Sequence, residues 1–101
     1  MTNGDDATGQ AAPTATELEF FWRPGCPFCM MLERDLDAAG IAVTKRNIWD
    51  EPEAAAIVRS IADGNETVPT VRIGDRALVN PPIVEVAGLL AEVAPQLLPQ
   101  R

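Results

Sequence analysis

The stretch "WRPGCPFCMML", residues 22–32, holds both cysteines of the chain, Cys26 and Cys29, with two residues between them. It directly follows "LEFFW", residues 18–22, a short and mostly apolar segment with three aromatic side chains. Such a segment is typical of a strand that is covered on both faces. The cysteines are therefore expected where a buried strand gives way to the next element.

From Pro27 onward the pattern becomes helical. Apolar residues recur at spacings of three and four, and charged residues take the other face. Gly40 is a typical residue to end such a helix. The predicted helix covers residues 27–39, and its expected buried face consists of Cys29, Leu32, Leu36 and Ala39.

The rest of the chain continues this alternation. "IAVTKRNIW", residues 41–49, predicts a second strand, and "DEPE" predicts a capping-box start of a second helix with Asp50 as N-cap. "TVPTVRIGDRALVN", residues 67–80, predicts two short strands joined by a Gly-Asp turn, and residues 81–94 predict a final helix. The buried stripes are expected at Ala54, Ile57, Val58 and Ile61 in the second helix and at Val86, Leu89, Leu90 and Val93 in the last.

This order of elements predicts an α/β fold. A βαβ unit followed by a β-hairpin and a C-terminal helix gives a mixed four-stranded sheet with helices on both faces. Residues 1–16 are small, polar and acidic, which predicts a disordered N-terminal tail. We expect the folded domain to cover residues 17–94 and a C-terminal tail to cover residues 95–101.

Composition excludes several classes of protein. With 101 residues, 47% of them hydrophobic, the chain supports one domain with its own core. The net charge of -7 argues against nucleic-acid and anionic-membrane partners. No apolar stretch reaches the about 20 residues that span a bilayer, and residues 1–16 lack a signal-peptide pattern. We therefore expect a cytoplasmic protein, in which paired cysteines are catalytic or metal-binding rather than structural.

The predicted structure gives the two cysteines different chemistry. Cys26 lies at the N-terminal boundary of the helix, where free N–H groups and the helix dipole stabilise a thiolate. The neighbouring Gly25 and Pro27 place it at the surface. Cys29, one turn later on the same face, is expected to be more buried, to have a nearly normal pKa and to form a disulfide with Cys26. Cys26 is therefore the expected attacking sulfur and Cys29 the resolving one.

Two other readings of the cysteine pair stay open. Half of a zinc site would need ligands from a second chain, because this chain has no His and no third Cys. Alternatively, the two thiols are inert members of the core.

Two neighbouring features offer further candidates. Arg23 either supports the thiolate or a ligand carboxylate, or is a solvated charge at a strand end. In "TVPTV", Pro69 either starts a strand or makes a cis-proline turn that exposes the backbone of Val68 to an extended substrate.

"CPFC" and "TVPTV" together resemble the dithiol glutaredoxin active site and its cis-proline loop, over roughly residues 17–94. "GNETVPTV" and the later "NPP" are most similar to mycoredoxins, the actinobacterial relatives that work with mycothiol. The resemblance implies a thioredoxin-like (glutaredoxin) fold, thiol-disulfide exchange, no bound cofactor or metal, and mycothiol or glutathione as cosubstrate. It implies S-thiolated proteins as substrates and a flavoprotein disulfide reductase as a further partner. The implied residues are Cys26 as nucleophile, Cys29 as resolving thiol, Phe28 beside the ligand groove, Thr67 and Val68 as backbone contacts, and Pro69 as the cis-proline.

One departure from the family concerns the thiol. Glutaredoxins usually place a Gly-Gly pair and an acid where this chain reads "VNPPI", and these groups hold the glutamyl end of glutathione. Pro81 and Pro82 offer no N–H, and Ile83 or a neighbour replaces the acid. This favours mycothiol, whose acetylated cysteine carries no ammonium.

The predicted function is therefore the reduction of mixed disulfides between proteins and a low-molecular-weight thiol. Two alternatives remain: a thioredoxin-like dithiol donor reduced directly by a flavoprotein reductase, for instance for ribonucleotide reductase, and a dimeric iron–sulfur or zinc binding module.

Overall fold

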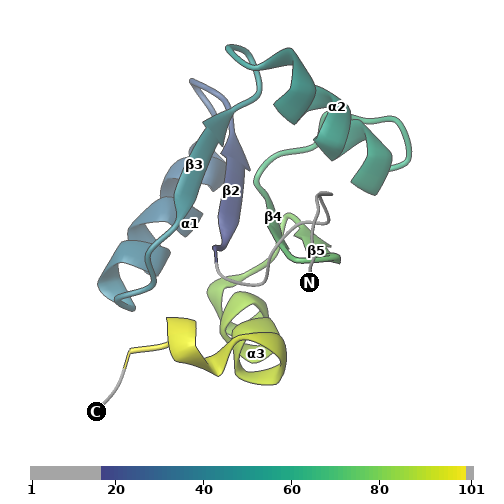
Figure 1. The fold of residues 1–101 in the computed structure, drawn as a ribbon. Coiled ribbons are helices and arrows are strands. Elements are labelled where there is room, and N and C mark those ends of the chain that lie inside the picture. Colours follow the sequence, from purple (N-terminus) through teal and green to yellow (C-terminus); the bar gives the residue numbers. More distant parts are fainter. Residues whose placement is uncertain (1–16, 100–101) are drawn as a thin grey trace, which may run out of the picture.

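A computed structural model describes residues 17–99 and shows a mixed sheet with helices on both faces (Figure 1). The sheet has four strands in the order β3-β2-β4-β5. The strands are β2 (Glu19–Trp22), β3 (Thr44–Asn47), β4 (Thr70–Ile73) and β5 (Arg76–Val79). The helices are α1 (Pro27–Ala38), α2 (Pro52–Ile61), α3 (Ile83–Val93) and the short 3-10 helix η1 (Pro95–Leu97). The predicted α/β thioredoxin-like fold is confirmed.

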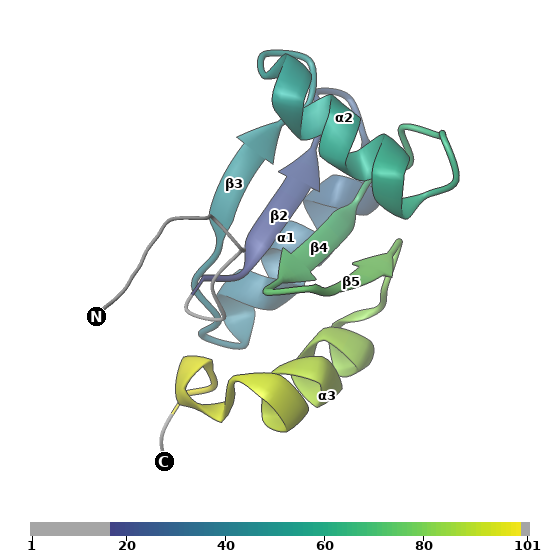
Figure 2. The ribbon, with the colours of Figure 1, turned by 45° about the vertical axis from the view of Figure 1, so that its right-hand side comes forward.

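The connections between the strands follow the predicted βαβ unit and hairpin. β2 and β3 pair in parallel across the connection through α1, whereas β4 pairs with both β2 and β5 in antiparallel fashion. Figure 2 shows the four strands side by side. Gly74, with φ of 60°, occupies the first position of the two-residue hairpin turn between Ile73 and Arg76. Glycine is favoured there because the turn needs a positive φ.

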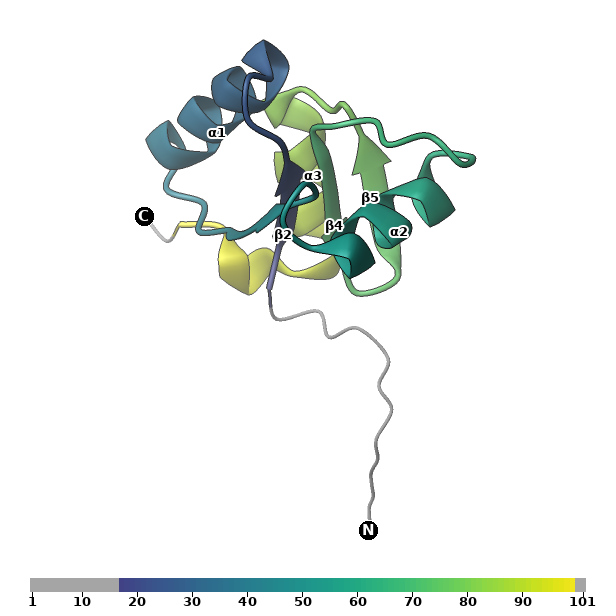
Figure 3. The same cartoon turned by 90° about the horizontal axis from the view of Figure 1, so that it is seen from above.

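The two phenylalanines at the centre of β2 serve opposite faces of the sheet. Both are fully buried. Phe20 packs with residues of α1 and α3, including Leu36 and Leu90, whereas Phe21 packs with Ala54, Ala55 and Val58 of α2. Viewed from above, α1 and α3 lie on one side of the strands and α2 on the other (Figure 3). The expectation that this strand is covered on both faces is confirmed.

The start of the second helix differs from the prediction. Glu51, not Asp50, is the N-cap of α2, and it makes no side-chain capping bond. Asp50 instead belongs to the turn after β3, where its N–H donates to the Asn47 carbonyl and its carboxylate accepts from the Asn47 amide. The Glu51 carboxylate is bound by Arg46 and so is unavailable as a cap. The strand predicted over residues 41–49 is correspondingly shorter, Thr44–Asn47.

The buried helix faces are largely as predicted, with local differences. Ala39 is exposed because it is the C-cap of α1. In α2, Ala55 takes a buried position, whereas Ile57 and Ile61 are half-buried. Small side chains allow α2 to approach the Phe21 ring closely. Val93 in α3 is half-buried.

The chain packs beyond the predicted end of the domain. The segment expected to be a C-terminal tail, residues 95–101, begins with η1, and Leu97 and Leu98 pack against the core. Residues 100–101 and the predicted N-terminal tail, residues 1–16, lie outside the described residues. Within residues 17–99, none of the helices is both long enough and apolar enough to span a bilayer.

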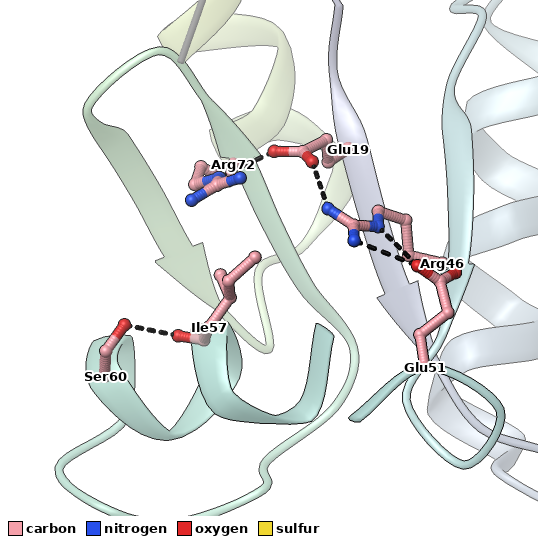
Figure 4. Close-up of polar contacts among 6 residues, drawn as sticks. All are labelled: Glu19, Arg46, Glu51, Ile57, Ser60 and Arg72. Carbon is pink, nitrogen blue, oxygen red and sulfur yellow. Dashed lines mark hydrogen bonds and ion pairs between the residues drawn. The ribbon is translucent and has the colours of Figure 1, made fainter. Parts of the chain in front are cut away.

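A charged network ties three strands together on the α2 face (Figure 4). The Glu19 carboxylate accepts from Arg46 at 2.8 Å and from Arg72 at 2.6 Å. Arg46 also binds Glu51 at 2.9 Å. Both guanidiniums lie over the Phe21 ring, at 5.6 and 5.9 Å from its centre. Glu19 therefore compensates two cations on this face of the sheet.

We expect Glu19→Gln to destabilise the protein more at pH 7 than at pH 3. Burial raises the pKa of Glu19, but hydrogen bonds from Arg72 and Arg46 outweigh it, so the pKa lies below its ordinary 4.5. A lowered folded-state pKa contributes stability above the unfolded-state pKa, and that stability is lost as the pH falls through the folded-state value. Urea unfolding should show a loss of about 1–3 kcal/mol at pH 7.

The control for this experiment is Glu92→Gln. Glu92 forms an exposed ion pair with Arg76, so its removal should change stability little at either pH. An equal loss at pH 7 and pH 3 in Glu19→Gln would contradict the role given to the ionised carboxylate.

Candidate active site

Cys26 lies at the junction between β2 and α1. Gly25, with φ of 73°, turns the chain, and Cys26 follows as the N-cap of α1 with Pro27 in the first turn. The Cys26 sulfur accepts a hydrogen bond from the Cys29 backbone N–H at 3.1 Å. This N–H is one of the donors that a helix leaves free at its start. The donor and the helix dipole both stabilise a negative charge on the sulfur.

The predicted surface position of Cys26 is wrong. Cys26 is only 3% exposed and Cys29 2%, and both belong to the core cluster that contains Phe20. The capping geometry turns the Cys26 side chain inward over the first turn of α1. Its sulfur also lies 3.9 Å from the Val68 carbonyl oxygen. A substrate disulfide can therefore reach this sulfur only through a small exposed area.

The predicted pKa of Cys29 is also wrong. Burial, followed by the hydrogen bond and the charge of Cys26, raises the pKa of the Cys29 thiol from 9.0 to about 12. The Arg23 backbone and guanidinium act in the opposite direction but do not outweigh them. Cys29 therefore stays protonated at neutral pH. It becomes a better nucleophile only after the charge on Cys26 has been removed.

The cis-proline loop lies beside the dithiol. The Val68–Pro69 peptide bond is cis, as the cis-proline reading of the sequence predicts. The Thr67 carbonyl accepts from the Thr70 hydroxyl at 2.9 Å, and the Pro69 carbonyl accepts from the Asn80 N–H at 2.7 Å. These bonds hold the loop at the start of β4, with Val68 next to Cys26. Ligand contacts by Thr67 and Val68 stay predictions.

Arg23 is more than a solvated strand-end charge. Its guanidinium donates to the Pro24 carbonyl at 3.0 Å and lies 5.6 Å from the centre of the Trp49 ring. Trp49 is 63% exposed, and sequence reasoning missed it as a residue near the site because it was placed at the end of a strand. An aromatic residue immediately before a predicted helix cap was the available signal. Arg23 therefore connects Trp49 with the region of the dithiol, because its charge also acts on Cys29.

Phe28 lines a hollow next to the dithiol. The hollow has a volume of about 310 Å³ and lies between α1 and the segment before α3. Sequence reasoning did not predict Met31, Asp35 and Asn80 at this place. The full lining is Phe28, Met31, Leu32, Asp35, Asn80, Pro81, Pro82 and Ile83.

The start of α3 offers few donors to a ligand. Pro82 is its N-cap and makes no side-chain capping bond, and Pro81 likewise lacks an N–H. The N–H groups of Glu85 and Val86 donate back to the Pro82 carbonyl. This geometry is consistent with the prediction that the start of α3 does not bind a carboxylate through backbone N–H groups.

A strand-to-helix dithiol facing a cis-proline loop, on a sheet of order β3-β2-β4-β5, defines a thiol-disulfide domain of the thioredoxin type. The glutaredoxin family model matches residues 18–78. The chain therefore belongs to the glutaredoxin family, whose members are in general thiol-disulfide oxidoreductases.

Relatives from actinobacteria are similar over most of the chain. The Mycobacterium tuberculosis protein Rv3198A, named as a glutaredoxin, is 39% identical over 78 residues, covering 76% of this chain and 93% of its own. Mycoredoxin 1 of Corynebacterium glutamicum is 36% identical over 70 residues, covering 68% of this chain and 86% of its own. These matches confirm the predicted resemblance to mycoredoxin-like glutaredoxins.

Solved structures support the fold. The thioredoxin-like protein BC3987, as the T8A mutant, superposes with a TM-score of 0.66 at 21% identity. The match covers 75% of this chain and 96% of that one. At this identity the match establishes the thioredoxin-like fold alone.

Proposed function

We propose that this protein reduces mixed disulfides between proteins and mycothiol, as a cytoplasmic enzyme without a bound cofactor or metal. The observation that carries the proposal is the Cys26 sulfur at the N-cap of α1, which accepts the Cys29 N–H at 3.1 Å. This arrangement provides one activated sulfur and one that is kept protonated.

In the first step, the Cys26 thiolate attacks the small-thiol sulfur of the mixed disulfide. The old S–S bond breaks, and its electron pair leaves with the protein sulfur, which takes up a proton. Cys26 is left in a disulfide with the small thiol. The leaving thiol accepts the charge more readily the lower its own pKa, as in any thiol-disulfide exchange.

Two routes clear the adduct. A second small thiolate can attack the bound small-thiol sulfur, which releases a symmetric disulfide and restores the Cys26 thiolate. Alternatively, Cys29 attacks the Cys26 sulfur, releases the small thiol and leaves a Cys26–Cys29 disulfide for an external reductant. Burial is the largest cause of the raised Cys29 pKa in the reduced protein. We therefore expect the first route to dominate while small thiol is abundant.

Mycothiol as the thiol is supported by two observations. Pro81 and Pro82 withhold N–H groups at the start of α3, where the family binds the glutamyl end of glutathione. Mycothiol has an acetylated cysteine and does not need the missing acid. In addition, one of the similar relatives is named a mycoredoxin.

The test uses one peptide whose cysteine forms a mixed disulfide either with mycothiol or with glutathione. It compares the rates at which the reduced protein reduces these two mixed disulfides. We expect kcat/KM to be about tenfold or more higher for the mycothiol mixed disulfide, as the loss of one or two well-placed contacts to glutathione would produce. A higher rate with the glutathione mixed disulfide would contradict the choice of mycothiol. It would leave the proposed reduction of mixed disulfides by Cys26 in place.

The alternatives predict other outcomes. Failure on both mixed disulfides, with turnover restored by a flavoprotein disulfide reductase and a protein disulfide, would identify a thioredoxin-like dithiol donor. Stoichiometric iron or zinc and a dimeric state in anaerobically purified protein would identify a metal-binding module.

A further inference from the structure

Trp49 is a large aromatic side chain that the fold leaves 63% exposed. It lies in the turn after β3, where its backbone N–H donates to the Asn47 side-chain oxygen at 2.9 Å. The Arg23 guanidinium lies 5.6 Å from the centre of its ring. Within residues 17–99, Trp49 belongs to neither hydrophobic cluster of the core. The ring is therefore held at its base by the turn and is open to a ligand.

The strand directions place Trp49 and the start of α3 on opposite sides of the dithiol. Because β2 and β3 are parallel, the turn with Trp49 and the segment with Cys26 leave the same edge of the sheet. β4 is antiparallel to β2, and β5 to β4, so the cis-proline loop before β4 and the segment after β5 lie at this edge too (Figure 2). In the strand order β3-β2-β4-β5, Trp49 therefore comes first, Cys26 and Val68 follow, and Pro81 comes last.

A small thiol in a disulfide with Cys26 can extend along this edge in two directions. Neighbouring strands are about 4.8 Å apart, so about 14 Å separate β3 from β5. The proposed function places the acetyl end of mycothiol on the α3 side. The amino and carboxyl groups of an extended cysteine residue leave it in opposite directions. The carboxyl side of the bound cysteine therefore points toward β3, where Arg23 and Trp49 lie.

The chemistry of mycothiol on its carboxyl side matches these two residues. Mycothiol carries a glucosamine and an inositol there, which are rings with many hydroxyl groups and no carboxylate. An aromatic face is electron-rich and packs against the slightly positive C–H groups of such rings. The Arg23 guanidinium has five N–H donors, and within residues 17–99 one bond occupies it, to the Pro24 carbonyl. The other donors are free to bind hydroxyl groups.

We infer that Trp49 is the platform on which the glucosaminyl-inositol part of mycothiol packs, with Arg23 donating to its hydroxyl groups. The inference rests on the proposed function, because it assumes that mycothiol is the small thiol bound to Cys26. It adds a binding residue outside the dithiol, the cis-proline loop and the start of α3. Selection of mycothiol then has an attractive contact in addition to the missing N–H donors at α3.

The test uses one peptide whose cysteine forms a mixed disulfide either with mycothiol or with N-acetylcysteine methylamide. These two small thiols share the acetylated cysteine and differ in the two rings. We expect kcat/KM of the unchanged protein to be about tenfold higher for the mycothiol disulfide, as one or two favourable contacts would produce. Trp49→Ala should bring this ratio close to one. Trp49→Phe, which keeps an aromatic face, should retain most of it.

Two controls accompany the test. The N-acetylcysteine methylamide disulfide contains the same reacting sulfur, so it reports any effect of Trp49→Ala on the dithiol through Arg23. Met30→Ala removes a similarly exposed apolar side chain, 64% exposed, from α1 and should keep the ratio of the unchanged protein. A ratio near one in the unchanged protein, or an unaltered ratio in Trp49→Ala, would overturn the inference. Failure of the unchanged protein to reduce either mixed disulfide would instead contradict the proposed function.

Discussion

Replacing Cys26 with serine is expected to lower kcat/KM for mixed-disulfide reduction at least about a thousandfold. A serine hydroxyl is not ionised at neutral pH and cannot displace a thiolate. Serine is nevertheless a good N-cap, so its oxygen can accept the Cys29 N–H in place of the sulfur. The fold should therefore survive, and the loss of activity can be assigned to the nucleophile. Steady-state reduction of the mycothiol mixed disulfide measures the effect.

Cys29→Ser is the matched variant for this prediction. The hydrogen bond to the Cys26 sulfur is donated by the backbone N–H of residue 29, and a serine at this position retains that N–H. Because the Cys29 pKa is raised to about 12, its thiol contributes little to clearing the adduct while small thiol is abundant. We expect activity within about tenfold of the unchanged protein.

The pair of variants separates the mechanisms. Complete loss in Cys29→Ser would favour the dithiol donor, since that route requires both sulfurs. Retained turnover in Cys26→Ser would show that Cys26 is not the nucleophile and would overturn the mechanism.

The parts of the fold that could be predicted from sequence are those set by local pattern. The adjacent Phe20 and Phe21 indicated a strand covered on both faces, because neighbouring residues of a strand point in opposite directions. Gly74 and Asp75 indicated the hairpin turn, and Pro27 marked the start of α1. Each of these signals comes from the preferences of a few residues that lie next to one another.

The wrong predictions concerned the direction in which individual side chains turn. Glu51 and not Asp50 precedes α2 because Asn47 holds Asp50 in a turn. Cys26 is buried because its sulfur turns toward Cys29 and Val68 rather than toward solvent. The spacing of residues in the sequence identifies where a helix starts. It does not specify whether the side chain of the N-cap residue faces the core or the solvent.

The hollow beside Phe28 could not be predicted for a related reason. On the helix pattern, Asp35 is one of several charges on the face away from the apolar stripe. Its place in the lining of the hollow arises from the segment before α3, which brings Asn80, Pro81 and Pro82 across from α1. Only the packing of residues some 45 positions apart distinguishes Asp35 from Asp37.

Phe21→Ala is expected to lower the free energy of unfolding by about 3–5 kcal/mol. The ring is fully buried beneath α2, where it packs with Ala54, Ala55 and Val58, and these small side chains would leave a cavity in its place. Arg46 and Arg72 would also lose the ring over which their guanidiniums lie. A loss of this size is a large fraction of the stability of a small domain. Urea unfolding at pH 7 measures it.

The control is Phe28→Ala, whose ring is 62% exposed and should contribute within about 0.5 kcal/mol. If Phe21→Ala does not fold, Phe21→Leu should show a smaller loss in the same direction. A loss below about 1 kcal/mol in Phe21→Ala would contradict the packing of α2 on this ring. Because the Phe21 cluster contains neither cysteine, whereas the Phe20 cluster contains both, the folded fraction of a Phe21 variant should keep the chemistry of Cys26. Phe20 lies on the other face of the same strand, in the cluster that contains both cysteines. Phe20→Leu should therefore change the rate of mixed-disulfide reduction as well as the stability.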